Sequence, residues 1–220
     1  MIKCLIFDCD GTLVDSEFLC NLGLEIKLRD YGIETSAYAM MEKYRGGKLA
    51  HILKSIEETH GILLKDDFVS AYRKLVDELF EKELNPCKGV TEFLALNTLP
   101  VCVASSGPVQ KINKALEITD LKQYFDNNVF SSYEINSWKP DPDVFLYATQ
   151  KMGFHPDECL VIEDSLKGIE AGLAAGIKTI LFDPTNLYQA IDKVPRIDNM
   201  NKLKNVISAH NRMYNTNPQT

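Results

Sequence analysis

Residues 4–15 read Cys-Leu-Ile-Phe-Asp-Cys-Asp-Gly-Thr-Leu-Val-Asp, and this stretch decides how the rest of the chain is interpreted. The apolar run from Ile2 to Phe7 predicts a short strand, buried on both faces, that stops at an acidic turn. Asp8 and Asp10 come just past the end of that strand, where open α/β sheets bind their ligands. The stretch therefore predicts a strand of the core and a candidate site at its carboxyl end.

The same acidic turn has a plainer interpretation. Asp-x-Asp-Gly after a strand is often only an Asx-type turn, or a calcium loop such as the EF-hand. Gly11 permits the sharp turn in either case, and Thr12 adds a hydroxyl group. An EF-hand does not fit, because a strand precedes the acids and no Glu occupies the twelfth position of the loop. A turn and a catalytic site both remain open on this stretch alone.

The composition is that of an ordinary globular protein. The chain has 220 residues, of which 45% are hydrophobic and 25% charged, and its formal net charge is −7. This length allows one large domain, or a core with a smaller insert. We expect no nucleic-acid partner because there is no basic run, and no membrane partner because no apolar run could span a bilayer. An acidic protein that acts on anionic substrates needs a metal ion or a few well-placed cationic side chains.

The cysteines indicate a reducing compartment. They lack C-x-x-C spacing and mostly lie in apolar runs, so we expect reduced core thiols of a cytoplasmic protein rather than disulfides. No signal peptide is expected, because Met1-Ile2-Lys3 leads directly into the first predicted strand. Cys9 lies between the two acids, and strand alternation should turn its side chain away from theirs. The cysteines are Cys4, Cys9, Cys20, Cys87, Cys102 and Cys159.

From Asp15 to Asn85 the pattern is helical throughout. The stretch from 17 to 31 has helical spacing, with Ser16 as its cap and Gly32 at its end. Hinge-like residues, Asn85-Pro86-Cys87-Lys88-Gly89, close the block. We therefore predict a helical cap domain over residues 15–86. Its further predicted helices cover 36–43, 48–59 and 66–84.

After residue 86, strands and helices alternate, which predicts βαβ units and a parallel sheet. We predict an α/β fold in which a Rossmann-like parallel core, residues 1–14 and 87–220, is interrupted after its first strand by the helical cap. A cap inserted there can act as a lid over the carboxyl ends of the strands. The predicted strands of this part are 100–104, 128–130, 158–162 and 178–182. The predicted helices are 90–96, 110–117, 142–152, 166–175 and 199–209.

Four polar signatures occur at the ends or connections of core elements: Asp8/Asp10, Ser105, Lys139 and Glu163/Asp164. In a parallel sheet these ends share one edge, so the residues can meet. Two carboxylates about 4 Å apart repel by about 4 kcal/mol at an effective dielectric constant near 20, so a cation must compensate. Mg²⁺ suits oxygen ligands. Zinc is disfavoured because the four histidines show no ligand spacing.

Each signature also has an interpretation without catalysis. Ser105 can belong to a turn before a helix, Lys139 can be a solvated loop lysine, and Glu163-Asp164-Ser165 can cap the next helix. Taken alone, Ser105 and Lys139 are better explained in this way. Their joint occurrence, in order and each near a strand end, favours a catalytic site.

The order of these motifs resembles the haloacid dehalogenase-like (HAD) hydrolase superfamily, in particular its members with a helical cap after the first strand. The resemblance extends from Ile2 to about Phe182. Within the superfamily the chain is most similar to 6-phosphogluconate phosphatases, with the β-phosphoglucomutase branch second. Three stretches carry this similarity: Arg45-Gly-Gly-Lys48-Leu, Ser105-Ser-Gly-Pro108 and Ser137-Trp-Lys-Pro-Asp-Pro142.

The resemblance implies a role for each motif residue. Asp8 would attack phosphorus and form an aspartyl-phosphate. Asp10 would protonate the leaving oxygen and then deprotonate the attacking water. Ser105 would donate a hydrogen bond to a phosphoryl oxygen, and Lys139 would neutralise charge between nucleophile and phosphate.

The resemblance also implies a Mg²⁺ site. Its ligands would be the carboxylates of Asp8 and Asp164 and the backbone carbonyl of Asp10, with Glu163 as a further ligand or as a support behind them. Dehalogenase members of the superfamily lack an acid at the position of Asp10. Its presence here therefore favours phosphate esters over haloacids.

The loop Arg45-Gly46-Gly47-Lys48 places two cations and two glycines between predicted helices of the cap. It can be a polar interhelix loop, or a specificity loop in which Arg45 and Lys48 grip a carboxylate or a second anionic group. We favour the specificity loop because of the cap topology. The candidate substrate-binding residues are Thr12, Arg45, Gly46, Lys48, Ser106 and Gly107.

We therefore predict a Mg²⁺-dependent phosphatase of small phosphorylated sugars or sugar acids that works through an aspartyl-phosphate. A β-phosphoglucomutase-like phosphomutase is the alternative enzyme, and it differs only in the acceptor of the phosphoryl group. A non-catalytic phospho-ligand binding protein is the alternative from another class. We expect a cytoplasmic monomer whose partner is a small phosphorylated metabolite.

Overall fold

The computed structural model describes residues 1–44, 47–188 and 193–216, with side chains of the last helix described as far as Arg212. The chain forms two compact units. The core unit comprises Met1–Val14 and Pro86–Thr220, and the insert comprises Asp15–Asn85. The core unit is α/β, and the described part of the insert is all helical.

A parallel sheet of six strands forms the centre of the core unit, in the order β3-β2-β1-β4-β5-β6. β1 lies between β2 and β4, and its residue Ile6 lies opposite Cys102 on one side and Val161 on the other. The strand order reverses at β1, and ligands bind open α/β sheets at such switch points. The strands are β1 (Cys4–Phe7), β2 (Val101–Ser105), β3 (Val129–Ser131), β4 (Cys159–Glu163), β5 (Lys178–Phe182) and β6 (Arg196–Ile197).

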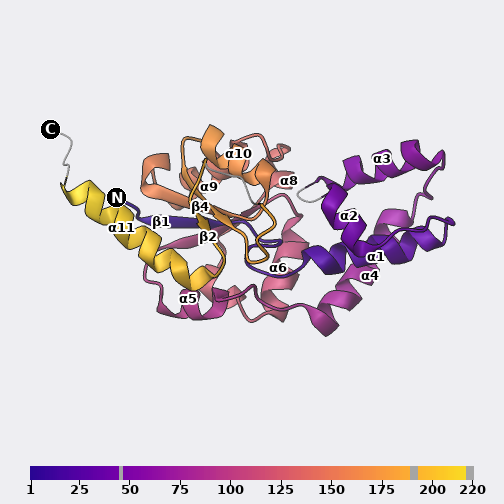
Figure 1. Ribbon diagram of the computed structural model, residues 1–220, viewed down its shortest axis with the longest axis horizontal. Helices are drawn as coiled ribbons and strands as arrows, with labels where there is room; N and C mark the ends of the chain where they lie inside the picture. Colours follow the sequence, from indigo (N-terminus) through magenta and orange to yellow (C-terminus); the bar gives the residue numbers. More distant parts are fainter. Residues whose placement is uncertain (45–46, 189–192, 217–220) are drawn as a thin grey trace. The chain divides into compact units, whose positions relative to one another are not determined.

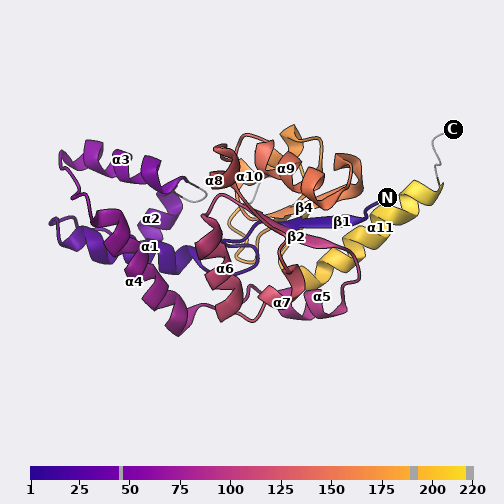
Figure 2. The same cartoon turned by 180° about the vertical axis from the view of Figure 1, so that it is seen from behind.

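Helices cover both faces of this sheet (Figures 1 and 2), and the four residues of β1 at its centre are accordingly all apolar and buried. On one face, Cys4 and Ile6 belong to a buried cluster with side chains of α9 (Asp143–Met152) and α10 (Leu166–Ala174). On the other face, the Phe7 ring packs against Phe93 and Phe125 at centroid distances of 6.3 and 6.1 Å. These two rings come from α5 (Val90–Leu96) and α7 (Lys122–Phe125).

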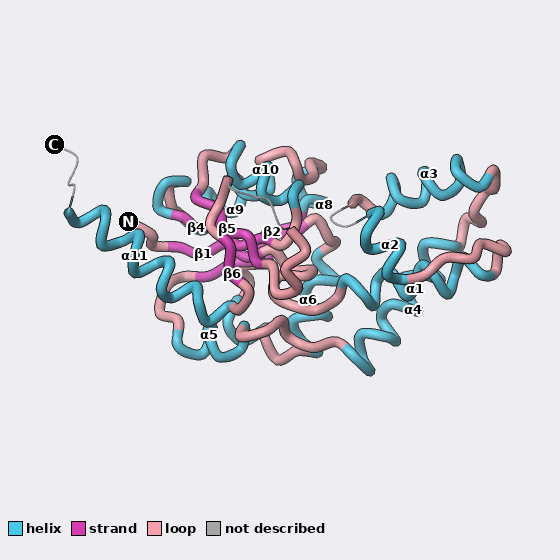
Figure 3. Tube along the Cα trace, in the orientation of Figure 1, coloured by secondary structure: helices cyan, strands magenta, loops and turns pink. Residues whose placement is uncertain are grey.

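The remaining described elements of the core unit connect or flank these layers (Figure 3). None of the described helices combines the length and the hydropathy that a membrane span requires. The two-residue strand β6 and the short helices α7 and α8 were not predicted from the sequence. The remaining elements are α6 (Val109–Ile118), α8 (Ser132–Ile135), α11 (Leu203–Thr216) and the 3-10 turns Pro156–Glu158 and Met200–Lys202.

The insert consists of α1 (Glu17–Arg29), α2 (Ala37–Tyr44), α3 (Leu49–His60) and α4 (Phe68–Glu83) in its described part. Helix α1 packs closely on α4, because a Cβ added to Gly23 would lie 2.7 Å from the Val76 side chain. Ser16 precedes α1, but the prediction that its side chain caps this helix is wrong. Its backbone is already helical (φ −92°, ψ −15°), whereas a capping residue normally has an extended backbone.

The predicted fold class is confirmed: a parallel α/β core contains a helical insertion after its first strand. None of the six cysteines, all of which lie among the described residues, forms a disulfide, as predicted, and only Cys20 is more than marginally exposed. Cys9 is 1% exposed and fills the core.

Candidate active site

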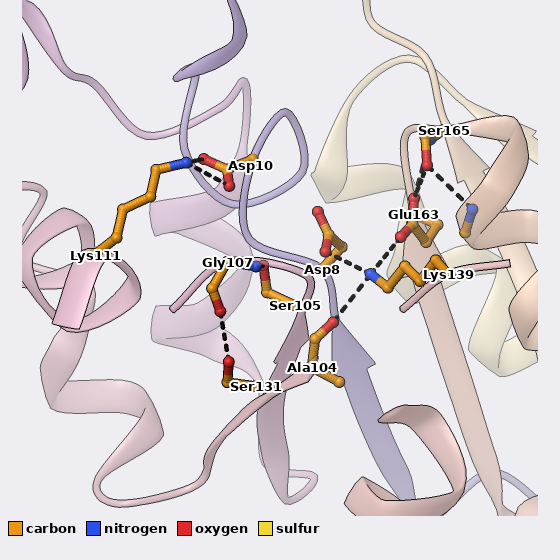
Figure 4. Close-up of polar contacts among 11 residues, drawn as sticks. Asp8, Asp10, Ala104, Ser105, Gly107, Lys111, Ser131, Lys139, Glu163 and Ser165 are labelled. Atoms are coloured by element: carbon orange, nitrogen blue, oxygen red, sulfur yellow. Dashed lines mark hydrogen bonds and ion pairs between the residues drawn. The ribbon is translucent and has the colours of Figure 1, made fainter. Parts of the chain in front are cut away.

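Lys139 lies at the centre of a buried ionic cluster at the carboxyl ends of β1, β2 and β4 (Figure 4). Its ammonium group donates to Asp8 Oδ1 at 2.5 Å and to Glu163 Oε1 at 2.6 Å. A third bond, of 3.1 Å, goes to the carbonyl oxygen of Ala104 at the end of β2. All three ammonium donors therefore have partners, and the interpretation of Lys139 as a solvated loop lysine is wrong.

Burial and charge act in opposite directions on this cluster. Burial raises the pKa of Asp8 to about 7, with the Lys139 ammonium opposing the shift and the Glu163 carboxylate adding to it. Burial by itself would lower the pKa of Lys139, but Asp8 and Glu163 outweigh it and raise that pKa above its usual value. A single ammonium therefore faces two buried acids. If both acids are ionised, the cluster carries a net negative charge, which a further cation would stabilise.

Glu163 is fixed from three sides. Its Oε2 accepts from the backbone N–H and from the hydroxyl of Ser165, each at 3.0 Å, while its Oε1 accepts from Lys139. The carboxylate also lies directly against α10, because a Cβ added to Gly168 would lie 1.8 Å from the Glu163 carboxyl carbon. Ser165 caps α10 by accepting from the Gly168 N–H at 3.1 Å. Helix capping at this motif is therefore real, and it coexists with the ionic cluster.

Three carboxylates, from Asp8, Glu163 and Asp164, offer oxygen atoms within 4.8 Å of one another. All three residues are buried. Gly11, in a left-handed conformation (φ +76°), lets the chain pass beside them, because a Cβ there would lie 2.3 Å from Asp164 Oδ2. Closely spaced carboxylate oxygens are the donor set that a hard divalent cation prefers, so the residues present fit a Mg²⁺ ion.

Ser105, the last residue of β2, is buried, and its hydroxyl oxygen accepts from the Gly107 N–H at 3.2 Å. The carbonyl oxygen of Gly107 in turn accepts from the Ser131 hydroxyl at 2.6 Å. Ser105 therefore does take part in a turn before a helix, and this contact leaves its hydroxyl hydrogen available to a ligand. Ser131 was not identified from the sequence, although Ser131-x-x-Glu134 has the spacing of a capping box. The Ser131 N–H does donate to the Glu134 carboxylate, at 2.8 Å.

The carboxylate of Asp10 forms an ion pair with a different lysine from the one that contacts Asp8 (Figure 4). The ammonium of Lys111, in α6, donates to Asp10 Oδ1 at 2.8 Å and to Oδ2 at 2.7 Å. Both side chains are about one quarter exposed, at 27% for Lys111 and 21% for Asp10. Lys111 was not identified from the sequence. Its position in the first turns of the helix after Ser105 is the only sequence signal that could have suggested it.

The other predicted substrate-binding residues are distributed over both units. Thr12 is fully buried, and its hydroxyl oxygen has no hydrogen-bond partner among the described residues. Ser106 and Gly107 are half-buried in the connection between β2 and α6. Lys48 precedes α3 in the insert, whereas Arg45 and Gly46 lie outside the described residues.

Comparisons with known proteins identify the family of the chain. A family model described as haloacid dehalogenase-like hydrolase matches residues 2–176, and the chain therefore belongs to the haloacid dehalogenase-like hydrolase family. The prediction of a hydrolase of this superfamily is thus confirmed.

Individual relatives match over nearly their whole length. The chain is 33% identical to the 6-phosphogluconate phosphatase of Escherichia coli K12, over 92% of this chain and 93% of that protein. It is 29% identical to the fructose-1-phosphate phosphatase of the same organism, over 80% of this chain and 94% of that protein. A solved haloacid dehalogenase-like protein from Agrobacterium tumefaciens C58 superposes with a TM-score of 0.82 at 30% identity, covering 96% and 99% of the two chains.

Proposed function

We propose that the chain is a Mg²⁺-dependent phosphatase that hydrolyses small phosphorylated sugars or sugar acids through an aspartyl-phosphate intermediate. The observation that supports it most is the ammonium of Lys139 held against the Asp8 carboxylate beside Asp164. The similarity to a 6-phosphogluconate phosphatase and to a fructose-1-phosphate phosphatase supports the substrate class.

Asp8 is the proposed nucleophile. One of its carboxylate oxygens attacks phosphorus, and the ester bond between phosphorus and the sugar oxygen breaks, which leaves the phosphoryl group on Asp8. A carboxylate and a phosphate dianion repel each other. Lys139 reduces this repulsion, because its ammonium lies 2.5 Å from Asp8 Oδ1 before any substrate binds.

Asp10 is the proposed acid and base. As the ester bond breaks, its carboxyl group gives a proton to the departing sugar oxygen. A water molecule then attacks the aspartyl-phosphate while Asp10 takes one of its protons. The bond between phosphorus and the Asp8 oxygen breaks, inorganic phosphate leaves, and both acids return to their starting state.

The proposed Mg²⁺ ligands are the carboxylates of Asp8 and Asp164 and the backbone carbonyl of Asp10. Glu163 is better suited to support than to ligation, because both of its oxygens already accept hydrogen bonds from Lys139 or Ser165. When bound, Mg²⁺ supplies positive charge that offsets the charge developing on the transferred phosphoryl group.

Ser105 is the proposed donor to a phosphoryl oxygen. Its hydroxyl oxygen accepts from the Gly107 N–H, which leaves the hydroxyl hydrogen to be donated elsewhere. We propose the insert, over residues 15–86, as the cap domain that determines specificity, with Arg45 and Lys48 binding a carboxylate or a second anionic group of the substrate. Ser106, Gly107 and Thr12 are proposed to complete the substrate contacts.

The test is phosphate release by the purified chain across a panel of sugar phosphates and phosphorylated sugar acids, with and without EDTA. We expect turnover that EDTA abolishes and added Mg²⁺ restores, and near-total loss in Asp8→Asn. Activity that is indifferent to EDTA would overturn the metal dependence. Recovery of an isomerised sugar phosphate in place of inorganic phosphate would assign the chain to the phosphomutases.

A further inference from the structure

We propose that Lys111 is a positioning residue for Asp10, an inference that rests on the proposed phosphatase function. The Lys111 ammonium bonds both oxygens of the Asp10 carboxylate, at 2.8 and 2.7 Å. A side-chain carboxylate held through one oxygen can still rotate about its last bond. A contact to both oxygens fixes the plane of the group and the direction in which its lone pairs point.

The Asp10 carboxylate lies beside the loop that follows β2. A Cβ added to Gly107 would lie 3.7 Å from Asp10 Oδ2 and 3.6 Å from Ser105 Oγ. The Asp10 carboxylate therefore lies over Gly107, on the same side of the loop as the Ser105 hydroxyl. Ser105, Gly107 and Lys111 all belong to the single connection from β2 into α6, so α6 fixes the acid relative to the proposed phosphoryl-binding serine.

The turn that carries Asp10 is itself well held. The Gly11 N–H donates to the Val14 carbonyl at 2.8 Å, and the Leu13 N–H donates to the Cys9 carbonyl at 2.9 Å. The backbone of Asp10 thus has a fixed position, and the freedom that matters for catalysis is that of its side chain. Lys111 restricts that freedom from a separate element, at a separation of 101 residues along the chain.

Lys111 and Lys139 have different roles in this arrangement. Lys139 is nearly inaccessible, with 4% of its side chain exposed, and it contacts the proposed nucleophile. Lys111 has 27% of its side chain exposed and contacts Asp10, the proposed acid and base. Partly exposed ion pairs contribute little to folding stability, so removing the Lys111 ammonium should alter Asp10 without unfolding the core.

The first experiment measures the dependence on the leaving group. An alkyl phosphate such as a sugar phosphate needs its leaving oxygen protonated, whereas 4-nitrophenyl phosphate leaves as a stabilised phenolate. If Lys111 acts through Asp10, Lys111→Met should lower kcat/KM for the sugar phosphate by at least about tenfold, which is part of the rate effect of a general acid. The same variant should lower kcat/KM for 4-nitrophenyl phosphate by less than about threefold. Equal losses on both substrates would overturn the proposal, as would wild-type rates on both.

Two matched variants complete this experiment. Lys111→Arg keeps the charge and can bond both oxygens of a carboxylate, so it should recover most of the loss. Failure of Lys111→Arg to recover any activity would contradict the two-oxygen contact. Lys204→Met, at an exposed lysine of α11, removes a charge elsewhere in the core unit and should behave as wild type on both substrates.

The second experiment asks whether Lys111 acts through Asp10. In an Asp10→Asn background the carboxylate is absent, so adding Lys111→Met should reduce kcat/KM by less than about twofold, because coupled residues are non-additive. Losses that multiply would overturn the proposal and indicate that Lys111 binds the substrate directly. If the wild-type chain released no phosphate from any sugar phosphate, the proposed function would fail instead, which the same assays distinguish.

Discussion

The ammonium nitrogen of Lys139 lies 2.5 Å from Oδ1 of Asp8, although 131 residues separate the two along the chain. The parallel sheet makes this possible, because β1, β2 and β4 all end at one edge and the Lys139 side chain reaches across it. The same ammonium also bonds Glu163, so one lysine compensates two buried acids. The predictions that follow test how stability and catalysis depend on this arrangement.

Removal of the ammonium should affect both folding and activity. In Lys139→Met, Asp8 and Glu163 remain as two buried acids without their counter-charge. Breaking a buried ion pair by removing one partner costs about 3–5 kcal/mol, so urea denaturation should show a loss of that size. Phosphatase activity should fall at least about 100-fold, since a charge that stabilises the transition state is lost. Lys204→Met is the control, and an unchanged unfolding free energy in Lys139→Met would contradict the buried pair.

Stability without metal should depend on pH through Asp8. Its pKa rises from 3.8 to about 7 on folding. Between these values the folded chain holds a proton that the unfolded chain has lost, so unfolding releases a proton and stability falls as the pH rises. In EDTA, the unfolding free energy of wild type should therefore decrease relative to Asp8→Asn from about pH 4 to pH 7. A constant difference between the two proteins over this range would show that Asp8 titrates normally.

The sequence predicted those features that depend on local pattern. The residues from Cys4 to Phe7 are apolar because their strand is covered on both faces, and a run of this kind can be recognised from the sequence alone. Asp8, Lys139 and Asp164 could be expected at one sheet edge because each follows a strand or a connection in the right order. Where a strand is only two residues long, as in β6, the pattern is too short to be recognised.

The features that the sequence did not predict depend on long-range contacts or on backbone geometry. Lys111 is one lysine on an amphipathic helix, and its sequence looks the same whether it faces solvent or Asp10. Ser16 has the residue type of a helix cap, but its helical backbone prevents that role. The sequence does not distinguish a metal ligand from a supporting residue at Glu163, because that depends on the hydrogen bonds from Lys139 and Ser165 to its two oxygens.

The close packing of α10 against Glu163 predicts that Gly168 cannot be replaced. In Gly168→Ala the new methyl group would lie 1.8 Å from the Glu163 carboxyl carbon, so the carboxylate must move and its bond to Lys139 is disturbed. Overpacking of this kind costs about 1–3 kcal/mol, and we expect a loss of that size together with reduced turnover. Glu170→Ala, at an exposed position of the same helix, is the control. Full activity in Gly168→Ala would contradict the supporting role of Glu163.

Magnesium binding should distinguish a ligand from a supporting residue. Asp164→Asn removes the negative charge of a proposed ligand, whereas Glu163→Gln alters a group that orients the site, and changes to such supporting groups typically alter metal affinity about 10- to 100-fold. Isothermal titration of the metal-free chain with Mg²⁺ should therefore show weaker binding in both variants and the larger loss in Asp164→Asn. Because a ligand that binds only the folded state stabilises it, the Mg²⁺-induced rise in Tm should decline in the same order. Asp157→Asn, at an exposed position of the 3-10 turn before β4, should bind as wild type does, and wild-type affinity in Asp164→Asn would overturn the proposed ligand set.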